Sequence, residues 1–182
     1  MRFVLARAFG RPIPGPILAL SYRRNACGRH LAGCVQEGLR GAREWSVWEI
    51  ELFAALVSSL NHCEFCAISH AAVAVRSLGD FEKVKRAVTD WRTADLEPRL
   101  RAALAFVEKL SLNPGEIGRA DVLAARAAGL NDLALREVIY VCFILSTMDR
   151  LADAFNFPLP DAPTLRRYVS IAVTFGYRNF RG

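Results

Sequence analysis

The stretch ELFAALVSSLNHCEFCAISH, residues 51–70, decides the fold of this chain. Its apolar pattern is interrupted by Asn61 and His62 and resumes after Cys63. The apolar residues do not alternate with polar ones as in a half-buried strand, and the spacing is typical of buried helices. The stretch therefore predicts two consecutive helices joined by a short turn.

Signals at the helix ends set the limits of these two helices. Ser46, with Glu49 three residues later, is the pattern of a capping box. It predicts a helix that ends at Leu60. Asn61 is a favourable N-cap residue, and it predicts a second helix over residues 63–78.

The rest of the sequence has the same helical periodicity. Further helices are predicted at residues 81–89, 96–110, 116–128, 132–154 (with Asp132 as the cap) and 164–174. The run VIYVCFI, residues 138–144, is the best candidate for a strand, but it lies within a longer helical pattern. Three prolines within residues 11–16 predict an extended segment. The predicted fold class is an all-α bundle.

Length and composition narrow the function classes. The 182 residues predict one domain, and 53% hydrophobic with 23% charged residues excludes a disordered chain. No apolar run is long enough to span a membrane. Arg7 interrupts any apolar signal region near the start, and five cysteines without such a signal indicate a reducing compartment. We therefore expect a cytoplasmic protein.

The basic residues are concentrated at both ends of the sequence. Residues 1–36 contain six Arg and residues 162–182 four, both without an acidic residue, whereas residues 37–161 carry a net charge of −4. No nucleic-acid motif surrounds the basic stretch at residues 22–24, so nucleic acid is not an expected partner. We expect the basic ends to pack against acidic surfaces of neighbouring subunits.

Several reactive side chains occur together only around the two central cysteines. Cys63, Cys66 and His70 fall on one face of a helix, across two turns. A helix N-terminus lowers a thiol pKa, and His70 is placed to exchange a proton with a thiol. Glu51 lies in an otherwise apolar helix, where a carboxylate needs a partner, and an imidazole is a natural one.

The spacing Glu51-x11-Cys63-x2-Cys66-x3-His70 resembles the motif of the AhpD-like alkylhydroperoxidases in the carboxymuconolactone decarboxylase family. The segments RLRAALAFVEKLSLNP and AGLNDLALREVIYVCFILSTMDRLADAF are similar to later helices of its peroxidase-related branch. The resemblance covers residues 44–160, the family core. It leaves residues 1–43 as a basic arm with a first helix and residues 161–182 as a C-terminal arm.

The resemblance implies an AhpD-like helical bundle built around a helix–turn–helix that carries CxxC. It implies that Cys66 is the peroxidatic thiol, Cys63 the resolving thiol, and Glu51 with His70 a proton relay. The substrate would be hydrogen peroxide or an organic hydroperoxide, and an external dithiol, lipoyl- or thioredoxin-like, would reduce the disulfide. Assembly into trimers, hexamers or similar rings is implied, and neither a cofactor nor a metal ion is expected.

The sequence departs from the family pattern at three places. His62 stands where Gly is common and is a possible auxiliary group beside Cys63, or simply a solvated turn residue. Phe65 replaces a frequent Tyr. Met148-Asp149-Arg150 stands where an Asn-Arg pair is common.

Two other readings of the motif stay open. A lyase like carboxymuconolactone decarboxylase would use His and an acid, but its reaction needs no dithiol. A non-catalytic helical oligomer or zinc-binding module would draw a fourth ligand from His62, His30 or Cys27. Of the remaining cysteines, Cys27 and Cys34 are assigned no role, and Cys142 is expected in the core.

Overall fold

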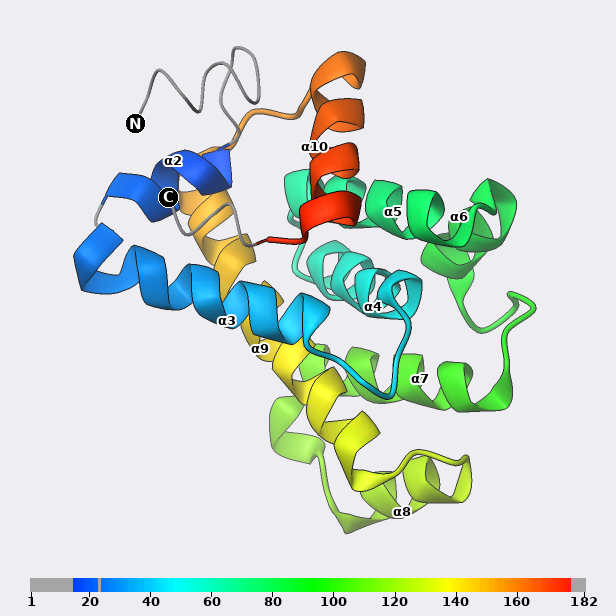
Figure 1. The fold of residues 1–182 in the computed structure, drawn as a ribbon. Coiled ribbons are helices and arrows are strands. Elements are labelled where there is room, and N and C mark those ends of the chain that lie inside the picture. Colours follow the sequence, from blue (N-terminus) through cyan, green and yellow to red (C-terminus); the bar gives the residue numbers. More distant parts are fainter. Residues whose placement is uncertain (1–14, 23, 178–182) are drawn as a thin grey trace.

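The computed structural model describes residues 15–22 and 24–177, and these contain helices and no β-strand. The all-α prediction is confirmed (Figure 1). The α-helices are α2 (Gly15–Tyr22), α3 (Arg29–Arg40), α4 (Val47–Leu60), α5 (Glu64–Leu78), α6 (Phe81–Asp90), α7 (Pro98–Leu112), α8 (Arg119–Ala127), α9 (Asp132–Ala154) and α10 (Ala162–Phe175). A π-helical turn, η1 (Arg24–Gly28), precedes α3, and a 3₁₀ turn, η2 (Pro114–Glu116), follows α7.

Helix α4 is the central element of the bundle. Every residue from Ile50 to Ser58 is buried, which explains why the helix is apolar on nearly all sides. It packs against α5, α7 and α9 (Figure 1). Glu51 is therefore carried into the interior by the helix that forms the core.

The turn between α4 and α5 differs from the prediction in one respect. Cys63, in extended conformation, is the N-cap residue of α5, whereas Asn61 follows the last turn of α4. The side-chain amide of Asn61 instead donates to Asp149 of α9 at 2.8 Å. The side chain that was predicted to cap α5 therefore binds another helix instead.

Other helix limits also differ from the prediction. Asn131, not Asp132, caps α9, because its side chain accepts the Ala134 N–H at 2.8 Å. Helix α8 begins at Arg119 rather than at residue 116, after the turn η2. The strand-like run at residues 138–144 lies inside α9, as the helical spacing predicted.

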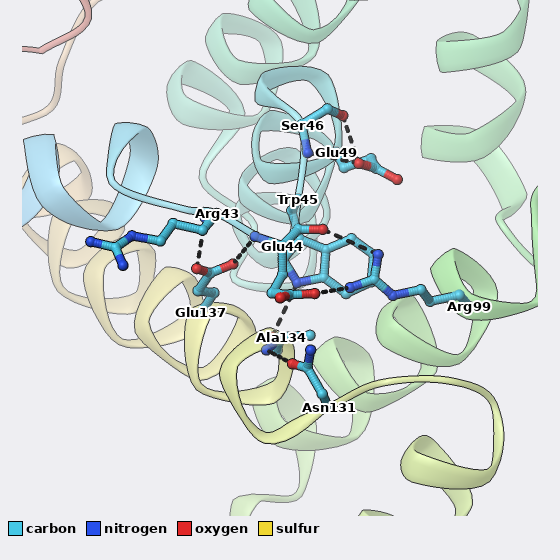
Figure 2. Close-up of polar contacts among 9 residues, drawn as sticks. All are labelled: Arg43, Glu44, Trp45, Ser46, Glu49, Arg99, Asn131, Ala134 and Glu137. Carbon is cyan, nitrogen blue, oxygen red and sulfur yellow. Dashed lines mark hydrogen bonds and ion pairs between the residues drawn. The ribbon is translucent and has the colours of Figure 1, made fainter.

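The linker between α3 and α4 is fixed to α9 and α7 by polar contacts (Figure 2). The Glu137 carboxylate accepts the backbone N–H groups of Arg43 at 2.8 Å and Glu44 at 3.1 Å. The indole of Trp45 donates to a backbone carbonyl of α9 at 3.1 Å. Arg99 of α7 binds both the carbonyl and the carboxylate of Glu44. These contacts set where α4 begins and hence where its side chains point.

Helix α10 belongs to the bundle and packs against α5 (Figure 1). It contains two of the arginines of the basic C-terminal end, Arg166 and Arg167. Residues 1–14, 23 and 178–182 lie outside the described residues, and they include the other terminal arginines except Arg24 and Arg29. The expected contacts of the basic ends with other subunits stay a prediction. Among the described helices, none is both long and apolar enough to cross a membrane.

Candidate functional site

Two reduced thiols lie at the start of α5. Cys63 is the N-cap residue and Cys66 lies in the first turn, and the two residues are 1% and 5% exposed. Their sulfur atoms and a carboxylate oxygen of Asp149 lie within 4.8 Å of one another. The thiols are thus close together in a largely water-free environment, beside an acidic group from another helix.

Asp149 is a site residue that the sequence prediction missed. It lies on α9 and is 1% exposed. Its carboxylate accepts a hydrogen bond from the hydroxyl of Ser58 at 2.9 Å and another from the side-chain amide of Asn61 at 2.8 Å. The available signal was an acidic residue within an apolar helical pattern, the same signal that singled out Glu51.

The surroundings raise the pKa of the Cys66 thiol. A hydrogen bond with Cys63 contributes most, followed by burial and by the negative charge of Asp149. The expectation that the helix N-terminus lowers the thiol pKa is therefore wrong for Cys66, because burial and a neighbouring carboxylate outweigh the helix dipole. Burial also raises the pKa of the Asp149 carboxyl, although hydrogen bonds from Asn61, Ser58 and Cys66 oppose this shift.

The predicted pair of Glu51 and His70 forms in the structure. The Nδ1 atom of His70 lies 2.6 Å from Oε2 of Glu51, which is completely buried. Oε1 of Glu51 forms an ion pair with Arg40 at 2.6 Å and accepts a hydrogen bond from the hydroxyl of Tyr177 at 2.9 Å. Burial alone would raise the pKa of Glu51, but His70 and Arg40 hold it below its usual value. Glu51 is therefore a carboxylate in the folded protein.

Three residues around this pair lie outside the motif and were not predicted: Arg40, Tyr168 and Tyr177. Arg40 comes from the end of α3 and lies over the Tyr177 ring at 4.8 Å. Gln36 accepts the Tyr177 backbone N–H at 2.7 Å and so fixes the chain after α10. Burial and the charge of Glu51 raise the pKa of both tyrosines, so their hydroxyls remain protonated donors.

A small cavity joins the thiol group to the histidine. It has a volume of about 30 Å³ and its lining includes Cys66, His70, Met148, Tyr168 and Tyr177. A space of this size holds about one or two water molecules. Of the two CxxC thiols, only Cys66 lines it.

The four predicted site residues thus meet at one place in the molecule. One group consists of Cys63, Cys66 and Asp149. The other group is the pair of Glu51 and His70, and the cavity lies between the two groups. His62 differs: it is exposed in the turn before Cys63, with a φ of 62°. Glycine adopts this left-handed backbone more readily than a residue with a Cβ atom does.

The donor atoms near the thiols bear on the zinc alternative. Structural zinc is held by four ligands. Within the described residues, the thiol cluster offers three donors, from Cys63, Cys66 and Asp149. The expected sources of a fourth ligand, His30, His62 and Cys27, are all exposed.

A larger groove, of about 410 Å³, lies between α3 and α9 and shares Ile144 with the lining of the smaller cavity. It is lined by Cys34, Tyr140 and Phe143, among others. None of the predicted site residues lines it, so the smaller cavity is the candidate site.

No protein-family model and no protein of curated function matches the sequence. Solved structures do match. An uncharacterized peroxidase-related protein from Silicibacter sp. TM1040 has a TM-score of 0.79 and 24% identity, over 92% of this chain and 86% of its own.

Two further structures are similar over comparable lengths. An uncharacterized peroxidase-related protein with an alkylhydroperoxidase AhpD core, from Ralstonia eutropha JMP134, has a TM-score of 0.76 and 20% identity, over 90% of this chain and 86% of its own. The debrominase Bmp8 has a TM-score of 0.74 and 20% identity, over 90% of this chain and 87% of its own. From its helices and the CxxC at the start of α5, this chain has the fold of the AhpD-like, peroxidase-related proteins.

Proposed function

We propose that this chain is a thiol-dependent peroxidase that reduces hydrogen peroxide or small organic hydroperoxides. The observation that carries the proposal is the pair of reduced thiols, one of which lines a peroxide-sized cavity together with His70. The similarity in fold to peroxidase-related proteins supports it.

The proposed cycle has two chemical steps. The thiolate of Cys66 attacks the terminal peroxide oxygen, so an S–O bond forms, the O–O bond breaks, and the leaving alkoxide or hydroxide takes up a proton. The thiol of Cys63 then attacks the sulfenic acid, so the disulfide forms and water leaves with the Cys63 proton. His70, oriented by Glu51, passes the proton to the leaving oxygen in the cavity.

The size of the cavity favours a small substrate. The fold also serves a debrominase, and a cysteine-to-alanine variant of that enzyme has been solved with 2,3,4-tribromopyrrole bound. A cavity of about 30 Å³ takes a peroxide group but not a halogenated ring. In the lyase alternative, the thiol pair would have no chemical role.

The cycle requires a partner that returns two electrons to the disulfide. We propose an external dithiol of lipoyl or thioredoxin type for this role, and a homo-oligomer as the working form. A cytoplasmic location would keep the thiols reduced between turnovers.

Peroxide consumption with a supplied dithiol tests the proposal. Cys66→Ser and Cys63→Ser should each lower the rate by at least about 100-fold, because the nucleophile or its resolving partner is lost. Cys34→Ser is the matched control, since Cys34 is exposed and lies outside the cavity. Peroxide loss that survives both CxxC substitutions would exclude the proposed cycle, and stoichiometric zinc in the purified protein would favour the zinc-binding module.

A further inference from the structure

We propose that Asp149 is the proton acceptor of the CxxC pair, taking the Cys66 proton as the thiolate forms and the Cys63 proton as the disulfide closes. This inference deepens the proposed peroxidase function and rests on it. It assigns a catalytic role to a residue outside the motif.

The geometry places the carboxylate within reach of both protons. Its oxygen and the two sulfur atoms lie within 4.8 Å of one another, and the carboxylate forms a hydrogen bond with Cys66. Ser58 and Asn61 each donate to a different oxygen, which fixes the group in place. Each carboxylate oxygen has two acceptor sites, so one site per oxygen remains for a thiol.

Among the described residues, no lysine or arginine that faces Asp149 neutralises its negative charge. From α4 and the turn after it come a hydroxyl and an amide, Ser58 and Asn61. From α5 come the two thiols and, farther away, His70. In the ion pairs of the described residues, Glu51 has Arg40, whereas Asp149 has no lysine or arginine.

A buried thiol whose pKa is raised does not release its proton readily to solvent. Burial raises the pKa of Asp149 as well, so its carboxylate is a stronger proton acceptor than that of an exposed aspartate. Transfer of the proton from Cys66 to Asp149 moves one negative charge from oxygen to sulfur and leaves the net charge of the pair unchanged. The thiolate can then form without adding a charge to the interior.

The protons and electrons of the cycle balance. The proton taken from Cys66 returns through the cavity and His70 to the leaving oxygen, giving an alcohol or water and restoring the carboxylate. In the second step the carboxylate takes the Cys63 proton and passes it to the hydroxide that leaves Cys66. The peroxide is the oxidant and the external dithiol is the final reductant.

The test measures thiol reactivity rather than turnover. Alkylation of Cys66 by iodoacetamide is followed by mass spectrometry as a function of pH, in a Cys63→Ser background with and without Asp149→Asn. The amide is nearly isosteric but accepts no proton. Asp153→Asn is the matched control, because it removes the same charge from an exposed position on the same helix.

With Asp149 present, the alkylation rate should stay nearly constant around neutral pH and fall in acid, where the carboxylate is protonated. With Asp149→Asn the rate should rise about tenfold per pH unit, as for thiol ionisation into solvent, and at neutral pH should be at least about 10-fold slower. The control should keep the original profile. An Asp149→Asn variant that reacts as fast or faster at neutral pH would overturn the inference, since Asp149 would then only repel the thiolate.

Ser58→Ala gives a second test that keeps the carboxylate. Removal of one donor should raise the pKa of Asp149 further and move the acid limb of the profile to higher pH. If the acid limb does not move, it reports the protonation of a group other than Asp149, and this result would contradict the inference. Thermal unfolding of each variant verifies folding. Failure of peroxide turnover with an intact alkylation profile would count against the proposed function alone.

Discussion

Three acidic side chains are buried in the described part of the chain, and each is stabilised differently. Glu51 has an arginine and an imidazole, and Glu137 accepts two backbone N–H groups. Asp149 has only neutral side-chain donors and the thiols. A buried carboxylate with the weakest compensation is the one most easily protonated, which is why Asp149 and not Glu51 suits proton exchange.

His62 is expected to be a strained residue. Its φ of 62° lies in the left-handed region, which is unfavourable for residues with a Cβ atom. His62→Gly should therefore raise the free energy of unfolding by about 0.5–1 kcal/mol, measured by urea denaturation. The side chain is exposed, so no packing is lost. Lower stability in the glycine variant would show that the imidazole makes a stabilising contact.

The residues that could be predicted are those close together in the sequence. Glu51, Cys63, Cys66 and His70 lie within two adjacent helices, so their spacing fixes their relative positions. Ser58 and Asp149 are 91 positions apart, and Glu51 and Tyr177 are 126 apart. Such contacts depend on how α9 and the segment after α10 pack, which periodicity does not specify.

A helix end was predicted correctly where the capping side chain binds only residues of its own helix end. At α4, the Glu49 carboxylate accepts the Ser46 backbone N–H at 2.8 Å, as the capping box predicted. At α5 the prediction was wrong, because the amide of Asn61 is bound to α9. Local signals set an element's limits only where no distant partner competes for the same side chain.

The linker that leads into α4 yields a prediction for a single glutamate. Glu137→Ala would leave the partly buried N–H groups of Arg43 and Glu44 without their acceptor (Figure 2). The free energy of unfolding should fall by about 2–4 kcal/mol, as measured by urea denaturation. Glu116→Ala, at an exposed position, is the control and should change stability little. Equal stability of the two variants would mean that the linker does not depend on Glu137.

The buried ion cluster around Glu51 connects distant parts of the molecule and should make stability depend on pH. The pKa of Glu51 is lower in the folded protein than in the unfolded chain, so its contribution is present above the usual carboxyl pKa of about 4.3 and is lost as the pH falls further. Glu51→Gln should lower the free energy of unfolding at neutral pH by about 3 kcal/mol. It should also make the acid loss of stability shallower.

Guanidinium denaturation at a series of pH values measures both effects. Glu82→Gln, which removes a charge at an exposed position, is the control and should keep the slope of the wild-type chain. An unchanged acid slope in Glu51→Gln would show that other carboxyl groups dominate acid unfolding.

The hydroxyl that binds Glu51 comes from Tyr177, 126 residues later in the chain. A ribosome makes proteins from the N-terminus, and early parts begin to fold before later parts exist. During synthesis, α4 and α5 therefore emerge while one oxygen of Glu51 still lacks the tyrosine. The thiols of α5 also lack Asp149 until α9 has been made. A growing chain thus carries the complete CxxC motif well before it carries the distant groups that complete the site.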